Sequence, residues 1–338
     1  MSKGYKYRGG KGLLSASGDS IFERDVQTIV NNQIYLPTIL ELNDPTEGFY
    51  NDSEISNIIN LFDSYSANVK DGYNSLVQKF KDVGIYSLSK NYDNELLWAY
   101  YADGHNGFAI EYDVEIVKQS LNHNPYIQLV YDFNVEYLLS VPKIGKEIFN
   151  KKNTKETLVK FLGSKSLSWK HEEEYRLVFE NKGLFDIDHR AVIAIYFGYR
   201  MQDSEIDYIM NKLKGRGLQY YKMDLLDKSY KLISKQIKDK YIDCPIYNAN
   251  VINYDIEQLL GYGGLFGAEA NLYRDKFIAA IESIKYEPLI KNFYMVSVND
   301  TDKTNLIFTV WANTKSGFPP IREFCFKLNK EGEITRIK

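Results

Sequence analysis

The chain has 338 residues, 44% of them hydrophobic and 26% charged, which is typical of a folded globular protein and excludes general disorder. Its 42 basic and 45 acidic residues give a net charge of -3, which excludes a general electrostatic attraction to nucleic acid or to an anionic membrane. The two cysteines lack the spacing of a zinc site or a disulfide framework, and the first residues lack the apolar core of a signal peptide. We therefore expect a reduced, cytoplasmic protein without a membrane partner.

Apolar spacing places the elements of the first two thirds of the chain. Ser20, followed by Glu23 three positions later, is typical of a helix start, and Asp71-Gly72 predicts a break in a long helical stretch. In chain order we predict a strand over 5–8, a helix over 20–31, a strand over 33–39, a helical region over 53–81, a strand over 85–89, a helix over 94–102, strands over 108–112 and 126–131, a helix over 154–166, strands over 174–179 and 191–197, a helix over 204–213 and a strand over 218–223.

The last third of the chain differs from the first two thirds in composition and in the order of its predicted elements. A Lys-rich stretch over 228–240 is typical of a solvated linker or helix. Beyond it, a helix over 269–284 precedes strand candidates over 293–298, 305–312 and 321–328, which predicts a small α+β domain whose antiparallel meander packs on the helix. We therefore divide the chain into an α+β domain (1–227), a linker (228–247) and a small interaction domain with a protein partner (248–338).

Three strand-like runs, far apart in the chain, carry polar residues at every second position. They are Arg8 in the first run, Ser87 and Ser89 in the second, and Glu172, Glu174 and Arg176 in the third. In a strand such residues share one face, so Glu172 and Glu174 would lie roughly 6–7 Å apart along the backbone. A guanidinium beside them would keep both carboxylates ionised, and such a face suits the stabilisation of developing positive charge. The alternative is a solvated strand laced by ion pairs, with the serines as surface filler.

Other sequence features exclude several chemistries. His105 lies in a Gly-bracketed turn, where loops often display functional groups, although a turn histidine also bonds its own loop. The remaining histidines lack ligand spacing to it, so we expect no metal. No nucleophile elbow surrounds Ser87 or Ser89, which argues against a serine hydrolase. The stretch from Gly261 to Gly267 lacks the Lys-Ser/Thr of a phosphate loop and predicts a hinge or turn.

Taken together, these segments resemble a bacterial family of unknown function. The resemblance covers residues 5–200 and leaves 245–338 outside. The matching pieces, in order, are Tyr5-Lys-Tyr-Arg8, Asn43-Asp-Pro-x-Glu47, Ser87-x-Ser89, Trp98-x-x-Tyr-Ala-Asp-Gly-His-x-Gly-Phe108, Lys165-Ser-x-x-Trp169-x-x-Glu172-x-Glu174-x-Arg176 and Phe197-Gly198.

That family in turn resembles the ADP-ribosyltransferase fold. One major class of these enzymes binds NAD with an arginine on the first strand, a Ser-Thr-Ser-like strand and a later Glu-x-Glu, in the chain order found here. The resemblance implies a mixed or antiparallel split-sheet α+β core with helices. The chain departs from the pattern at Leu88, which replaces the middle residue of the serine strand, and in the long insert before that strand.

The resemblance also implies roles for individual residues. Arg8 would hold the pyrophosphate or the nicotinamide ribose, Ser87 or Ser89 would orient the glutamate, Glu174 would bind the ribose hydroxyl, and Glu172 would position or deprotonate an acceptor. The candidate nucleotide-binding residues are Arg8, Tyr86, Tyr92, Trp98, His105 and Arg176, although the helical spacing of Trp98 also fits a core position.

The leading hypothesis is therefore an ADP-ribosyltransferase or NAD glycohydrolase that uses NAD as a substrate without a metal. It would act as a bacterial toxin or phage-defence effector on a protein side chain, nucleic acid or water. The alternative is a non-catalytic binding or regulatory protein on the same scaffold. A third hypothesis, a metal-dependent nuclease, draws on Glu172, Glu174 and Asp186 but lacks the usual Asp…Glu-x-Lys grouping.

Overall fold

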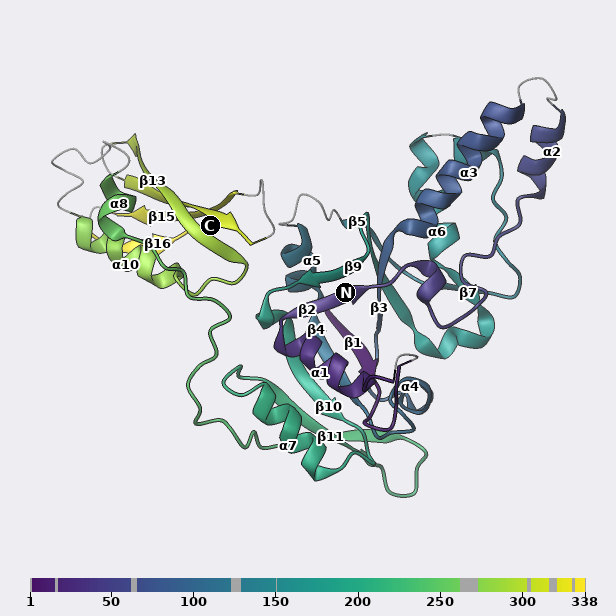
Figure 1. Ribbon diagram of the computed structural model, residues 1–338, viewed down its shortest axis with the longest axis horizontal. Coiled ribbons are helices and arrows are strands. Elements are labelled where there is room, and N and C mark those ends of the chain that lie inside the picture. The colour runs from purple at the N-terminus through teal and green to yellow at the C-terminus, as the bar shows by residue number, and fades with distance from the viewer. Residues whose placement is uncertain are drawn as a thin grey trace.

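The computed structural model describes residues 2–15, 18–61, 66–122, 129–149, 151–261, 273–302, 305–315, 321–329 and 332–337. They form a two-part α+β architecture: a large mixed sheet with helices, and a smaller antiparallel sheet that lies with its own helices at the C-terminal end of the chain (Figure 1). The predicted fold class is confirmed. None of the described helices is long and apolar enough to cross a membrane.

The large sheet has eight strands, and its centre is built from the strands that carry the predicted site residues. From edge to edge it contains β12 (Leu232–Ile237), β11 (Gln219–Leu225), β10 (Val192–Phe197), β4 (Phe108–Asp113), β1 (Lys3–Arg8), β3 (Gly84–Ser89), β8 (Glu174–Phe179) and β5 (Leu129–Asn134). β10 and β11 pair in parallel, and the other neighbours pair antiparallel. The three strands that were far apart in sequence, β1, β3 and β8, are therefore direct neighbours.

The ladder between β1 and β3 is short. Within the described residues of these strands, Tyr5 opposite Ser89 is the one pair in register, whereas β1 pairs with β4 at six positions and β3 pairs with β8 at six. Past Tyr5, the side chain of Lys6 reaches across instead, and its Nζ donates to the carbonyl oxygen of Ser87 at 2.9 Å. The sheet thus opens between these two central strands.

Helices and two small sheets surround the large sheet. The helices are α1 (Ile21–Val30), α2 (Ser53–Leu61), α3 (Ser66–Asp82), α4 (Glu95–Tyr101), α5 (Val114–Asn122), α6 (Thr154–Leu162) and α7 (Asp203–Lys212). The small sheets pair β2 (Gln33–Leu36) antiparallel with β9 (Gly183–Asp186), and β6 (Glu136–Leu138) parallel with β7 (Ser164–Ser166). Ser20 caps α1 as predicted, because its side chain accepts from the backbone of Glu23.

Hydrophobic clusters pack on both faces of the sheet. On one face there are two separate clusters, and polar side chains lie between them. One face packs on α1 and α7 and forms the largest cluster, which includes Leu88 and Leu177. On the opposite face, Tyr5 packs with residues of α4, and Val178 packs with residues of α3 and α6. The side chain of Arg176 lies between these two clusters, because it alternates with Leu177 on β8. The polar residues of β3 and β8 therefore face a space bounded by apolar packing.

Two predicted elements were wrong. The expected helix break at Asp71-Gly72 does not exist, because α3 runs through both residues. An exposed glycine costs a helix only about 1 kcal/mol, and the buried residues Tyr73 and Phe80 hold this helix on the protein. The Lys-rich stretch is not wholly a linker, since β12 pairs with β11 along six positions. Leu232 is buried, and an edge strand commonly exposes lysines.

Other element boundaries shifted. The strand from Gln33 ends at Leu36, because Pro37 cannot donate to a ladder. Helix α5 follows β4 directly and was not predicted. The expected strand over 126–131 and the expected helix over 269–284 begin in residues outside the described ranges, and their described parts are β5 and α10. The glycine-rich stretch beyond 261 also lies outside them.

The C-terminal part has its own core. It contains α8 (Ile256–Gly261), α10 (Arg274–Ile284), β13 (Ile290–Asp302), β14 (Asn305–Thr314), β15 (Ile321–Leu328) and β16 (Ile334–Arg336), with the strands in sequential antiparallel order (Figure 1). Phe277 of α10 stacks on Phe308 of β14 at 4.4 Å between ring centroids. The predicted helix followed by a meander is confirmed, and β16 adds a fourth strand.

Replacing Gly72 by alanine tests the continuity of α3. A Cβ at Gly72 would meet nothing within 4 Å. Gly72→Ala is therefore expected to raise the free energy of unfolding by about 0.5–1 kcal/mol, because alanine loses less backbone entropy in a helix. Urea denaturation followed by circular dichroism measures the change, and a lowered stability would contradict a continuous helix. Gly107→Ala is the opposing control: its Cβ would lie 2.0 Å from the carbonyl oxygen of Arg8, so a loss of about 1–3 kcal/mol is expected.

Candidate functional site

A cavity of about 270 Å³ lies where β1 and β3 separate. Strands β1, β3 and β8 line it, together with residues 37–47, α4 and Lys165 of β7. It brings together six of the residues singled out from the sequence, which are Arg8, Ser87, Ser89, Glu172, Glu174 and Arg176. The antiparallel register explains the serines, because Ser87 lies opposite Arg176 and Ser89 lies opposite Glu174.

Glu172 reaches the cavity by a different route from the one predicted. It is not part of β8, which begins at Glu174, but ends the 3₁₀ helix η4 (Leu167–Glu172). Between them, Glu173 has a φ of 43° in the left-handed region, so the chain turns before it enters the strand. An alternating sequence cannot distinguish this turn from two more strand residues. Both carboxylates nevertheless approach Lys165, Glu172 at 2.6 Å and Glu174 at 3.6 Å.

Arg176 is the centre of a buried ion-pair network. Its side chain is 0% exposed. Its Nε and Nη2 donate to the two oxygens of Glu174 at 2.8 and 3.0 Å, and its Nη1 and Nη2 donate to the two oxygens of Glu47 at 2.9 and 2.7 Å. Nη1 also donates to the carbonyl oxygen of Leu162 at 2.5 Å. The planar guanidinium therefore holds two carboxylates in bidentate geometry.

Lys165 completes the network. Its ammonium lies 3.2 Å from Glu47 and contacts Glu172 and Glu174 as well. Tyr101 of α4 donates its hydroxyl to Glu172 Oε1 at 2.5 Å. Three buried carboxylates thus share two buried cations, which leaves one excess negative charge beside the cavity.

The network fixes the charge state of its members. Burial alone would raise the pKa of Glu174, but the charges of Arg176 and Lys165 outweigh it and lower that pKa to about 2. Burial alone would lower the pKa of Lys165, but the three surrounding carboxylates raise it. At neutral pH Glu174 is therefore a carboxylate that can stabilise positive charge but cannot donate a proton.

The two serines have different surroundings. Ser89 Oγ donates to the carbonyl oxygen of Glu172 at 2.9 Å and accepts from the backbone N–H of Asn91. Ser87 Oγ is buried and has no hydrogen-bond partner with acceptable geometry among the described residues. It lies close enough to Glu174 to contribute a small part of the lowering of that pKa. Ser89 thus positions the backbone of Glu172, while the hydroxyl of Ser87 lies beside the carboxylate of Glu174.

Arg8 borders the cavity but does not join the carboxylate network. Tyr5 shares its sheet face with Ser89, so Arg8, three positions later, leaves β1 on the opposite face. There its Nη1 lies 3.9 Å from Asp25 Oδ1 of α1. Its side chain is 18% exposed, and its Nε has no hydrogen-bond partner among the described residues. The guanidinium therefore places a positive charge at the border of the cavity.

The other predicted nucleotide-binding residues do not line this cavity. Tyr86 is buried in the main core, and Trp98 is buried with its indole N–H donating to the carbonyl oxygen of Tyr92. Tyr92 stacks on Tyr196 at 4.7 Å between ring centroids. His105 has a φ of 73° and lies parallel to the Trp98 ring at 6.5 Å between centroids. Tyr92, Trp98 and His105 thus pack around α4, as the core interpretation of Trp98 predicts, whereas Tyr86 belongs to the core on the other face of the sheet.

Several cavity residues were not assigned a role from the sequence. Among them are Lys6, Glu47, Tyr101 and Lys165. All four belong to the motifs on which the family resemblance rests. A polar residue that lies in such a motif and that no turn or helix cap requires is a candidate site residue, so the sequence could have indicated these four. The sequence alone could not show that Glu47 contacts Arg176, because the two residues are far apart in the chain.

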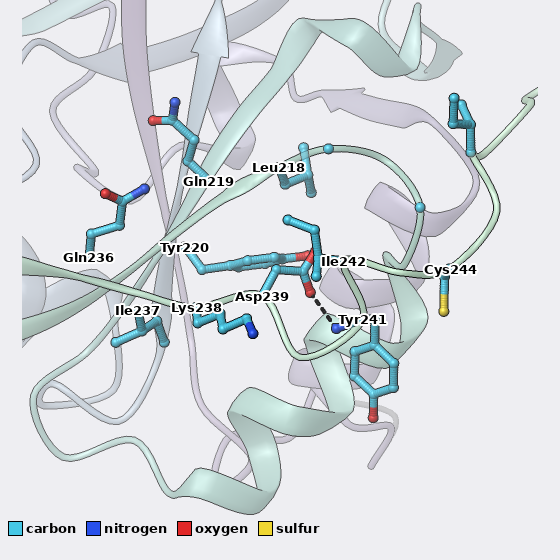
Figure 2. A pocket seen from close by; sticks show the side chains of 13 residues that line it. Leu218, Gln219, Tyr220, Gln236, Ile237, Lys238, Asp239, Tyr241, Ile242 and Cys244 are labelled. Atoms are coloured by element: carbon cyan, nitrogen blue, oxygen red, sulfur yellow. Dashed lines mark hydrogen bonds between the residues drawn. The ribbon is translucent and has the colours of Figure 1, made fainter.

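A larger cavity lies elsewhere, between the segments around Tyr220 and Ile242, and measures about 630 Å³ (Figure 2). Figure 2 shows Asp239 there, which accepts a hydrogen bond from the backbone N–H of Tyr241. Cys244 at its rim is a free thiol. The convergent charges of the smaller cavity favour it as the chemical site.

The nuclease hypothesis finds less support in the coordinates. Asp186 lies on β9, where it accepts from Gln33, and it does not line the cavity. Among the described residues, no three His, Cys, Asp or Glu side chains are grouped so that they could hold a metal ion. The cavity carboxylates are held by Arg176 and Lys165 instead.

Comparison with known proteins supports part of the resemblance. A family model described as a protein of unknown function (DUF2971) matches residues 97–177. This segment runs from α4 to β8 and includes Tyr101, Lys165, Glu172, Glu174 and Arg176. No curated protein and no solved structure matches the chain. Residues 97–177 are therefore similar to an uncharacterised family, and the relationship to ADP-ribosyltransferases stays a prediction.

Replacing Arg176 by methionine tests the network. The variant is expected to lose about 3–5 kcal/mol of unfolding free energy at pH 7, because it leaves buried carboxylates without their cation. Denaturant unfolding at several pH values measures the loss. Lys182→Met, which removes an exposed pair with Asp82 at 3.4 Å, is the control and should change stability by less than about 1 kcal/mol.

The pH dependence of that loss follows from Glu174. Because its pKa is lowered to about 2, pairing with Arg176 contributes stability that is fully present above the unfolded-state pKa of about 4.3 and is lost as the pH falls through about 2. The difference between wild type and Arg176→Met should therefore shrink between pH 5 and pH 3. A difference that stays constant over this range would contradict a charged pair.

Proposed function

We propose that the cavity between β1 and β3 is the active site of an NAD-consuming enzyme, an ADP-ribosyltransferase or an NAD glycohydrolase. The observation that carries the proposal is Glu174, a carboxylate held ionised at a cavity that Ser87, Ser89 and Arg8 also line. The order of these residues along the chain and their positions on adjacent central strands support it. A fixed negative charge beside a cavity suits a reaction that develops positive charge on a sugar.

In the proposed reaction, the bond between ribose C1′ and the nicotinamide nitrogen breaks, and its electrons leave with nicotinamide. Glu174 would stabilise the positive charge that develops on the ribose and accept a hydrogen bond from a ribose hydroxyl. Glu172 would take the proton of the acceptor as it attacks C1′. Tyr101 and Lys165 hold Glu172 for this task. The acceptor is a protein side chain, nucleic acid or water.

The size of the cavity suggests how the substrate lies. At about 270 Å³ it is slightly smaller than most pockets that enclose a complete small molecule. It would take the nicotinamide and its ribose, and the pyrophosphate would then lie near the positive charge of Arg8, which lines the cavity. The C-terminal part, with its separate core, would bind a protein partner of a toxin or phage-defence effector.

The network also favours a second candidate, a non-catalytic binding or regulatory protein. Both oxygens of Glu174 already accept from Arg176, and both oxygens of Glu47 do the same. A buried network whose members are satisfied rigidifies a fold without any chemistry. In this case the cavity would bind a ligand and leave it unchanged.

Glu174→Gln separates the two candidates. The enzyme hypothesis predicts that the wild type releases nicotinamide from NAD and that the variant is slower by about 10²-fold or more, because the carboxylate acts on the transition state. Chromatography of nicotinamide measures the rate, with protein, nucleic acid and water offered as acceptors. Glu115→Gln, at an exposed glutamate of α5, is the control and should be as active as wild type.

A wild type that releases no nicotinamide and labels no acceptor contradicts the enzyme hypothesis. The binding hypothesis predicts instead that Glu174→Gln lowers the melting temperature while cellular activity is unchanged. Measuring the melting temperature of the variant also shows whether a lost activity reflects unfolding.

A further inference from the structure

Lys6 occupies the gap in the sheet and has no role in the proposed reaction. Its side chain lines the cavity, and its Nζ spans from β1 to the carbonyl oxygen of Ser87 on β3. Part of its surface remains exposed because the cavity borders it, while the surrounding strands desolvate the ammonium group. The amine therefore faces a ligand-sized space from a desolvated position.

The cavity holds two lysines with opposite surroundings. Lys165 touches three carboxylates, at 2.6, 3.2 and 3.6 Å. Lys6 has no carboxylate within 4 Å among the described residues and contacts the Ser87 carbonyl and the Tyr86 ring, whose centroid is 5.3 Å from Nζ. A carbonyl and a ring face favour an ammonium ion far less than a carboxylate does. The environment of Lys6 thus favours the neutral amine.

The charges around Lys6 act in the same direction. Burial is the main cause that lowers the pKa of Lys6, the nearby positive charge of Arg8 adds to this effect, and the resulting pKa is about 7. Glu174, Asp25 and Glu172 oppose the shift from a distance without cancelling it. About half of the Lys6 side chains are therefore unprotonated near pH 7, when an ordinary lysine is almost fully protonated.

We propose that Lys6 is the reactive amine of this cavity and forms a reversible imine with the aldehyde or ketone group of a ligand. A desolvated amine beside another cation is a recognised nucleophile for carbonyl carbon. The Nζ lone pair adds to that carbon, both Nζ protons are transferred to the former carbonyl oxygen, that oxygen leaves as water, and a C=N bond remains. The open-chain form of a pentose phosphate matches this site, since the positive charge of Arg8 borders the same cavity and would pair with the phosphate.

Reductive trapping on the full chain tests the inference. The protein is incubated with ribose 5-phosphate and sodium cyanoborohydride at pH 7, and labelled lysines are mapped by peptide mass spectrometry. Lys6 should be labelled at least about tenfold faster than Lys182, which is 52% exposed and represents an ordinary surface lysine. Lys165 should remain unlabelled, because its carboxylates keep it protonated. The inference fails if Lys6 is no faster than Lys182, or if Lys165 reacts as fast as Lys6.

The pH dependence of labelling and a Lys6 variant provide two further tests. Between pH 8 and pH 6, the neutral fraction of Lys6 falls about tenfold, whereas that of an ordinary lysine falls about a hundredfold, and only Lys6 should approach a plateau above pH 8. Lys6→Arg should remove the adduct. If that variant does not fold, the comparison of labelling at Lys6, Lys165 and Lys182 in the wild type is sufficient to test the inference. Trapping at Lys6 without nicotinamide release would uphold this inference and reject the proposed function, while the reverse result would do the opposite.

Discussion

The pairing of Arg176 with Glu174 and Glu47 is the interaction on which the rest of the site depends. Arg176 is fully buried and joins β8 to the segment that follows Pro37, far away in the chain. A guanidinium in such a place is stable only with carboxylates in bidentate contact, and those carboxylates are stable there only with the cation. The same contacts hold Glu174 ionised, so the stability of the fold and the charge at the cavity have one origin.

The opening between β1 and β3 turns this network into a site. If the two strands paired along their full length, the side chains of Ser87 and Glu174 would face only the packing between two hydrophobic clusters. Because the ladder stops after Tyr5, the gap admits Lys6 and leaves a cavity that both faces of the sheet reach. Arg8 can therefore approach from the face of α1 and Glu174 from the opposite face. The opening in the sheet therefore allows side chains that leave their strands on opposite faces to contact one ligand.

Two lysines in one cavity illustrate how surroundings decide chemistry. Lys165 lies among three carboxylates and is a permanent cation, which orients Glu172 and offsets the negative charge. Lys6 meets a backbone carbonyl, an aromatic ring and a neighbouring guanidinium, so burial dominates and the amine is half neutral. Residue type alone predicts neither state. The difference follows from which strands bring which partners within a few ångströms.

The sequence by itself determined the α+β class, most strands and helices, and the candidate residues Arg8, Ser87, Ser89, Glu172 and Glu174, because local periodicity and motif order are properties of short segments. It could not show that Glu172 lies outside β8, since one left-handed residue at Glu173 leaves no alternation signal. Only the tertiary structure placed Glu47 and Lys165 around Arg176, separated Trp98 and His105 from the cavity, and opened the sheet at Lys6. These outcomes depend on pairing between distant segments, and a buried charge reveals its partners only when the chain is folded around it.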